Sequence, residues 1–112
     1  MFSLDLIVKA DPIVEVGIDE QAHLYVTPAS ATFAQIYREA REVHWDAAAN
    51  RLHSPKPRDW SHAQWFRQIV DTADAHGQPL CLTPATVWVN IPHELKAEIQ
   101  RIMPSAVGTH EV

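Results

Sequence analysis

Residues 42–66 read EVHWDAAANRLHSPKPRDWSHAQWF and hold three of the chain's four tryptophans and three of its seven histidines. Within this stretch, VHWD and RLHS flank the flexible AAAN segment, a pattern that predicts a small hairpin. Two prolines then keep SPKPR in an extended, polyproline-like path. We expect Trp45, Leu52 and Trp60 to point inward and anchor this connection, because each buried tryptophan removes on the order of 200 Å² from water.

The end of this stretch predicts a helix start with two capping devices. Ser61 is placed to accept a hydrogen bond from the backbone of Gln64, whose side chain can reach back, and Trp60 is placed to close against Trp65 as a hydrophobic staple. Gly77 then supplies the usual helix stop. Truncation of Trp60 to alanine is therefore expected to cost about 2–4 kcal/mol. The positions predicted to face the core are Trp65, Phe66, Ile69, Val70 and Ala73.

Before the stretch, three strands are predicted at residues 2–9, 13–18 and 23–27. The first alternates apolar and polar side chains, and turn residues separate all three, so they would form an antiparallel meander. From residue 33 the apolar spacing changes to that of a helix, which is predicted over residues 33–43.

After the stretch, LCLTPATVWVNI (residues 80–91) predicts two short strands of a hairpin about Pro84 and Ala85. A last helix is predicted from Pro92, because its fixed φ suits a first helical position. Its inward positions would be Leu95, Ile99, Ile102 and Met103. Residues 104–112 are predicted to be a loose C-terminal tail.

These elements predict an α+β fold. Adjacent strands followed by helices indicate an antiparallel or mixed sheet of about five strands, with three helices packed mainly on one face. The other face would be either solvated or covered by a partner. The length of 112 residues is typical of one domain, so residues 1–112 are assigned to a single domain.

Composition narrows the class of protein. The net charge is −5, and no basic run is longer than KPR, which argues against nucleic acid and against anionic membrane surfaces. The single cysteine, Cys81, lies in the apolar segment PLCLT, which predicts a buried, unreactive thiol. Asp5 interrupts the first apolar run, so no signal peptide is predicted, and no stretch approaches the roughly 20 apolar residues of a membrane span. A cytoplasmic protein is expected.

The histidines of residues 42–66 suggest a binding site more than the tryptophans do, because packing does not account for them. His44, His53 and His62 recur every nine residues, and with Asp46 they supply the residue types of a polar or acid–base site. The basic KPR lies between them, and it could clamp an acidic group beside an aromatic ring. The candidate ligand- or partner-binding residues are His44, Asp46, His53, Lys56, Arg58, Trp60 and His62.

The alternative is a structural role for the same residues. The histidines would then be solvated, and Arg58 would stiffen the connection by pairing with Asp59 or by lying against Trp60. No histidine pair has a recognised metal-ligand spacing, and no phosphate-binding glycine loop or nucleophile motif is present in the sequence. We therefore predict no metal site, no cofactor and no particular catalytic residue.

The segments EVHWD, LHSPKPRDWS, WF and TVWVNIP resemble those of short proteins encoded by mobile integron gene cassettes of environmental bacteria. The resemblance spans about residues 23–100. It implies a small, soluble protein of α+β or unusual fold, from a group whose members often self-associate and mostly have no assigned activity, and it favours an accessory or adaptive role. It implies no catalytic residue.

Three functions follow as hypotheses. The first is a non-enzymatic binding or interaction module that acts as a homodimer, because a sheet face without helices needs a partner. The second is a small-molecule-binding protein or small enzyme with its site around residues 44–62. The third is an antitoxin- or immunity-type protein whose acidic charge meets a basic toxin.

Overall fold

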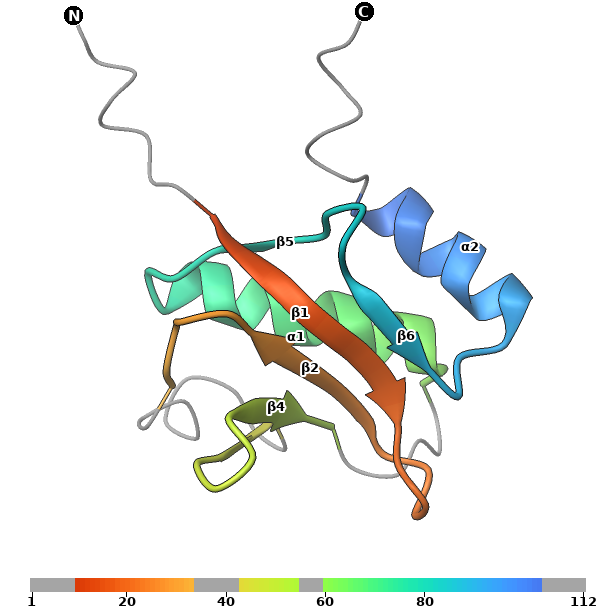
Figure 1. Cartoon of the computed structure of the whole chain (residues 1–112), viewed down its shortest axis with the longest axis horizontal. Coiled ribbons are helices and arrows are strands. Elements are labelled where there is room, and N and C mark those ends of the chain that lie inside the picture. Colours follow the sequence, from red (N-terminus) through yellow and green to blue (C-terminus); the bar gives the residue numbers. More distant parts are fainter. Residues whose placement is uncertain (1–9, 34–42, 55–59, 104–112) are drawn as a thin grey trace, which may run out of the picture.

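The computed structural model describes residues 10–33, 43–54 and 60–103, in which two helices and a mixed sheet share one core (Figure 1). Helix α1 lies behind the sheet in this view, and α2 lies beyond β6. The strand order is β3-β4-β2-β1-β5, with β6 also paired to β1. The elements are β1 (Asp11–Ile18), β2 (Leu24–Pro28), β3 (His44–Asp46), β4 (Arg51–His53), α1 (His62–Ala75), β5 (Leu80–Cys81), β6 (Val87–Val89) and α2 (His93–Ile102).

Strands β1 and β2 form an antiparallel hairpin at the centre of the sheet, which confirms the two strands predicted there. Val16 pairs with Val26, and both side chains are fully buried. The turn is fixed locally, because the Asp19 carboxylate accepts hydrogen bonds from the backbone N–H groups of Gln21 and His23 at 2.9 Å each. The sheet is therefore organised around β1, which has neighbours on both sides.

Strands β3 and β4 form the small hairpin predicted around AAAN. The carboxylate of Asp46 accepts hydrogen bonds from the N–H groups of Ala48 and Ala49 at 3.1 and 3.2 Å, and Asn50 closes the turn with a φ of 56°. Leu52 is fully buried and Trp45 packs against the core, so both predicted anchors of this hairpin point inward.

Helix α1 begins and ends as the sequence predicts. The Ser61 hydroxyl accepts from the Gln64 N–H at 3.2 Å, and the Gln64 side chain accepts from the Ser61 N–H at 2.8 Å, which completes a capping box. At the other end Gly77 has a φ of 89°, and the Gln78 N–H donates to the Ala73 carbonyl at 3.0 Å. The buried residues of α1 are Ala63, Trp65, Phe66, Ile69, Val70, Thr72 and Ala73.

The predicted hairpin over residues 80–91 is wrong. Strands β5 and β6 do not pair with each other; both run parallel to β1, with Asp11 beside Leu80 and Val16 beside Trp88. The turn between them stays in the plane of the sheet, because the Thr86 hydroxyl donates to the Ile13 carbonyl at 2.7 Å. Residues 80–89 thus form one interrupted strand, and α1 is the crossover that returns the chain to it.

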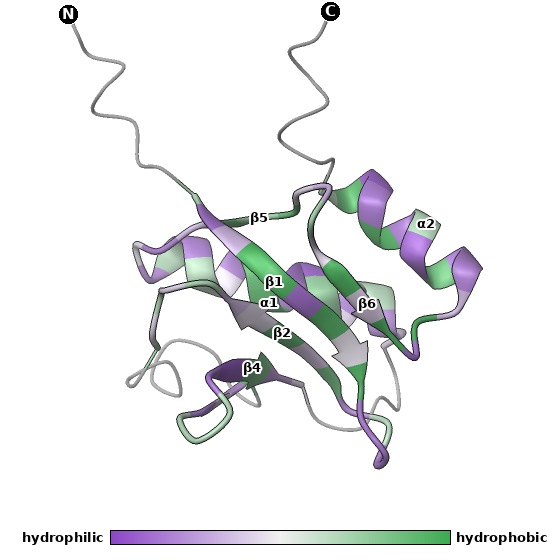
Figure 2. Ribbon diagram, viewed as in Figure 1, coloured by the Kyte–Doolittle hydropathy of each residue, from purple (hydrophilic) through white to green (hydrophobic). Residues whose placement is uncertain are grey.

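Helix α2 completes the core at the β6 side of the sheet. Figure 2 shows it alternating between hydrophobic and hydrophilic residues. Ile99 is fully buried, and Leu95, Ile102 and Met103 pack against the core, which confirms the inward face predicted from the sequence. Neither helix in the described residues is long and apolar enough to cross a membrane.

Part of the predicted architecture lies outside the described residues. The strand at 2–9, most of the helix at 33–43 and the tail at 104–112 fall there. Within the described ranges the sheet has six strands, where about five were predicted. The same ranges contain two helices, where three were predicted. The sheet is mixed, and the α+β class is confirmed.

Trp60 is not the inward anchor that the sequence suggested. Its ring lies 4.7 Å from that of Trp65, between centroids, which confirms the staple contact, but 42% of its surface is exposed. The reason is position, since the residue before an N-cap lies at the rim of the core.

We therefore expect Trp60→Ala to lower the free energy of unfolding by about 0.5–1.5 kcal/mol, the worth of an aromatic contact without full burial. Chemical denaturation with an unchanged m value measures this directly. A loss above about 2 kcal/mol would restore the role of Trp60 as a core anchor.

Candidate functional site

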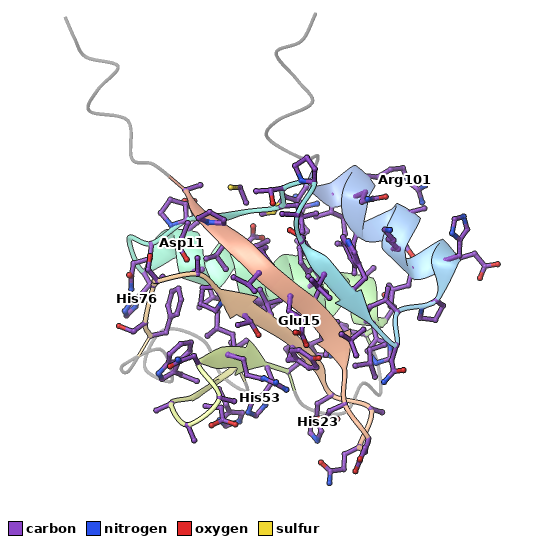
Figure 3. All side chains as sticks on the ribbon, in the orientation of Figure 1. Asp11, Glu15, His23, His53, His76 and Arg101 are labelled. Atoms are coloured by element: carbon purple, nitrogen blue, oxygen red, sulfur yellow. The ribbon has the colours of Figure 1, made fainter. Side chains whose placement is uncertain are left out.

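The face of the sheet opposite α1 carries a group of polar and charged side chains. Val16, Leu24, Val26 and Leu52 point into the core, so strand alternation places their neighbours on the other side, which we call the open face. Figure 3 shows Glu15 on the sheet, His53 beside β4, and His23 near the β1–β2 turn. We call the following residues the open-face cluster: Glu15, His23, Tyr25, His44, Arg51 and His53.

Tyr25 is the centre of the cluster. It pairs across the strands with Gly17, and its ring lies where a side chain at that position would be: a Cβ on Gly17 would fall 2.4 Å from the ring carbon Cζ. The Tyr25 hydroxyl donates a hydrogen bond to the Glu15 carboxylate. The Arg51 guanidinium carbon lies over the ring, 3.8 Å from its centroid. Tyr25 is thereby 95% buried although it lies on the open face.

The environment of Tyr25 fixes its protonation state. Burial, followed by the hydrogen bond to Glu15 and the charge of Glu15, raises the pKa of Tyr25 to about 12. The hydroxyl therefore stays protonated at neutral pH and acts as a hydrogen-bond donor to the carboxylate.

Three histidines lie side by side, two on β3 and β4 and one directly before β2. The ring centroids of His44 and His53, which are cross-strand partners, are 5.6 Å apart, and those of His23 and His53 are 5.9 Å apart. The Nδ1 of His23 donates to the Ser54 carbonyl at 2.7 Å, because a carbonyl can only accept. The Nδ1 of His53 is buried, and a backbone hydrogen bond with Ser54 contributes to the pKa of this side chain.

Arg51 is held against the Tyr25 ring but forms no ion pair within the described residues. Its cross-strand neighbour is Asp46, whose carboxylate binds the backbone of the β3–β4 turn instead. Within the described ranges Arg51 forms no salt bridge, and its buried Nε has no hydrogen-bond partner. A planar guanidinium with unused donors can bind a carboxylate or phosphate through two parallel hydrogen bonds.

The structure brings together some of the residues predicted for the site. His44, Asp46 and His53 lie on the β3–β4 hairpin and share the open face. His62 does not join the histidine row: its Nε2 lies 3.1 Å from the Ala22 carbonyl in the β1–β2 turn. Trp60 packs on Trp65 at the start of α1. Lys56 and Arg58 lie outside the described residues.

Sequence reasoning missed four members of the cluster: Glu15, His23, Tyr25 and Arg51. A signal for two of them was present, because the alternation in HLYVT places His23 and Tyr25 on the face opposite Leu24 and Val26. Arg51 belongs to the predicted hairpin, but its contact with Tyr25 depends on the pairing of β4 with β2.

The described part of the chain contains one thiol and no cluster of metal-ligating side chains. No group of three or more His, Cys, Asp or Glu side chains in it is arranged to hold a metal ion. Burial raises the pKa of the half-buried Cys81 thiol, which makes it less reactive. A pocket of about 330 Å³ opens between α1 and α2, but its Arg67 and Asp71 lie 3.7 Å apart and pair with each other.

The histidine row predicts a pH-dependent stability. Burial, followed by the positive charge of neighbouring His44, lowers the pKa of His53 below its ordinary 6.5. The unfolded chain therefore binds a proton at His53 more readily than the folded protein does, so this contribution is fully present above about pH 6.5 and is lost as the pH falls below it.

We expect His53→Gln to reduce the loss of stability between about pH 7 and pH 5, measured by denaturant unfolding at each pH. His93→Gln, which changes an exposed histidine at the start of α2, is the control and should retain the full loss. Equal pH dependence in wild type and His53→Gln would show that His53 does not contribute.

The fold and the open-face cluster define a small α+β protein built around a mixed sheet, with helices on one face and a polar surface on the other. The chain matches the family model for Integron Cassette Protein Hfx_Cass5 over residues 11–86, from the start of β1 to the residue before β6. The protein therefore belongs to the Hfx_Cass5 integron cassette protein family. This confirms the resemblance seen in the sequence.

A solved structure of the same kind is also similar to this chain. It is described as an integron cassette protein, Hfx_Cass5, from the mobile metagenome of North West Arm Sewage Outfall. The sequences are 44% identical, the match covers 85% of this chain and 96% of the other, and the TM-score is 0.44. A search of curated proteins finds no match to this chain. The family description names an integron cassette and no activity.

Proposed function

We propose that this integron cassette protein is a non-enzymatic binding module that holds its ligand on the open face of the sheet. The observation that carries the proposal is Arg51, whose guanidinium is held against Tyr25 but forms no salt bridge within the described residues. Buried polar atoms without partners cost stability, so the unpartnered Nε of Arg51 favours a function for this residue.

Other features of the cluster favour binding over catalysis. The hydroxyl of Tyr25 is used by Glu15, and its pKa of about 12 is far from that of a general base at neutral pH. The groups are held in place by one another: the ring supports Arg51, and Gly17 makes room for the ring. A rigid set of donors of this kind is typical of recognition surfaces. A mobile cassette origin agrees with an accessory role.

A thermal-shift screen over several classes of metabolites tests the proposal. We expect a ligand that raises the melting temperature of wild type and of Arg67→Gln, which removes a charge from the exposed surface of α1, but not that of Arg51→Gln. If every stabilising compound acts equally on all three proteins, the open face is not the binding site.

A homodimer is the second candidate, and a specific observation favours it. Val14 and Val87 are 45% and 51% exposed, and Val87 lies beside Glu15 on the open face. Exposed apolar side chains on neighbouring strands are a usual feature of self-association surfaces. Light scattering after size exclusion at tens of micromolar protein should then give a dimer mass for wild type and a monomer mass for Val87→Lys. A monomeric wild type would contradict this candidate.

A further inference from the structure

Resting on the proposed function, we infer that the β4 part of the open-face cluster is an oxyanion site that binds a carboxylate or phosphate group. Arg51 and His53 are two residues apart on β4, so both side chains project from the same face. His44 stands directly across from His53 on β3 and is exposed. A group bound at Arg51 would thus meet two imidazoles on its neighbouring side.

The position of Arg51 is set before any ligand arrives. Its guanidinium carbon lies 3.8 Å from the Tyr25 ring centroid, and the ring is fixed by the Glu15 hydrogen bond and by the space above Gly17. Little side-chain freedom remains to be lost on binding, which favours affinity. The guanidinium still keeps its donors, because contact with a ring face uses none of its N–H groups.

The neighbouring carboxylates are engaged elsewhere, so they compete weakly for Arg51. Asp46 accepts two backbone hydrogen bonds in the β3–β4 turn, and Glu15 accepts from Tyr25. Both nevertheless carry negative charge close to the site. The net charge of −5 also repels anions at long range, so binding has to come from short-range contacts with Arg51 and the histidines.

Protonation of the histidine row should strengthen the site. Each imidazole that gains a proton adds a positive charge and a second donor. The titratable and charged groups that face His53 come from four strands and a turn: Glu15, His23, Tyr25, His44, Asp46 and Arg51. Because a bound anion favours the protonated form of His53, whose pKa lies below 6.5, anion affinity should rise as the pH is lowered below about 6.5.

The test is an NMR titration of the whole chain with two probes, inorganic phosphate and succinate, at constant ionic strength. We expect saturable amide shifts in β3, β4 and β2. Affinity should fall by at least about tenfold in Arg51→Lys, because lysine keeps the charge but cannot form the bidentate hydrogen bonds. Binding should vanish in Arg51→Gln. Arg67→Gln, an equal loss of charge on exposed α1, should bind as wild type does.

The two probes distinguish the source of the oxyanion, since the better ligand identifies a carboxylate or a phosphate preference. The native amide spectrum of each variant shows that it is folded before titration begins. Shifts that do not saturate, or that persist in Arg51→Gln, would overturn the inference. If a neutral or cationic compound shifts the same amides while both probes fail, the proposed function stands and the oxyanion inference falls. If no compound shifts them, the proposed function itself fails.

Discussion

Replacing Phe66 with alanine is expected to lower the free energy of unfolding by about 3–5 kcal/mol. Phe66 is fully buried on the face of α1 that packs against the sheet. Its removal costs the transfer of the ring from water and leaves a cavity that surrounding side chains fill only in part. Since a domain of this size is stable by about 5–15 kcal/mol, the variant should unfold at a much lower denaturant midpoint.

Two variants on the same helix are controls for Phe66→Ala. Phe66→Leu keeps most of the volume and should cost less than half as much as the alanine variant. Arg67→Ala changes an exposed side chain one position away and should stay within about 1 kcal/mol of wild type, since its pair with Asp71 is on the surface. A loss below about 1 kcal/mol for Phe66→Ala would mean that α1 does not pack on the sheet as described.

Replacing Gly17 with alanine is expected to cost about 1–3 kcal/mol, although only one methyl group is added. The new Cβ would lie 2.3 Å from the Tyr25 hydroxyl oxygen and 2.7 Å from Cε2, so the ring has to move. Tyr25 is 95% buried and its ring contacts Arg51, and moving the ring breaks the hydrogen bond to Glu15. Denaturant unfolding measures the cost, and the pKa of Tyr25 should fall from about 12 as the hydroxyl becomes solvated.

A double-mutant cycle makes the steric explanation testable. Gly17 does not have a positive φ, so its backbone accepts an alanine without strain, and Tyr25 is the obstacle. In a Tyr25→Ala background we expect Gly17→Ala to stabilise the protein by about 0.5 kcal/mol, because alanine loses less backbone entropy than glycine. The same destabilisation in both backgrounds would show that the ring is not responsible.

The sequence was informative where structure is decided within a few residues. The capping box of Ser61 and Gln64, the stop at Gly77 and the β3–β4 hairpin are all closed by contacts between near neighbours. Each of these was predicted correctly because its residues specify a local geometry. The inward face of α2 follows for the same reason, since helical spacing alone selects it.

The errors come from contacts between distant parts of the chain. Residues 80–91 contain turn signals, and these favoured a hairpin, but the strands pair with β1 and not with each other. Nothing local distinguishes the two outcomes, because both bury the same apolar side chains. The predicted burial of Trp60 was wrong for a similar reason. Its contact with Trp65 was predicted correctly, but how deeply the ring is buried depends on what surrounds it.

In the candidate site too, local contacts were predicted and contacts between distant parts of the chain were not. His44 and His53 were expected to matter, and the hairpin makes them neighbours. The pairing of β2 with β4 brings the other residues around these histidines together, namely His23, Tyr25 and Arg51. That register is chosen by the burial of Val26 and Leu52 on the other face. The core therefore determines which polar residues come together on the open face.

The interrupted edge strand also has a consequence for how the chain folds during synthesis. The side of β1 away from β2 is occupied by β5 and β6, and the hydrogen bond from Thr86 to Ile13 joins residues 73 positions apart. A ribosome releases β1 early, yet within the described part of the chain the N–H and C=O groups on that side pair only with residues 80–89, which emerge much later. Sheet completion should thus be a late step, and a slow one, because it closes a long loop. Nascent chains shorter than this would present an unpaired strand edge to one another, which makes a pause in translation before β5 the point of greatest risk for aggregation.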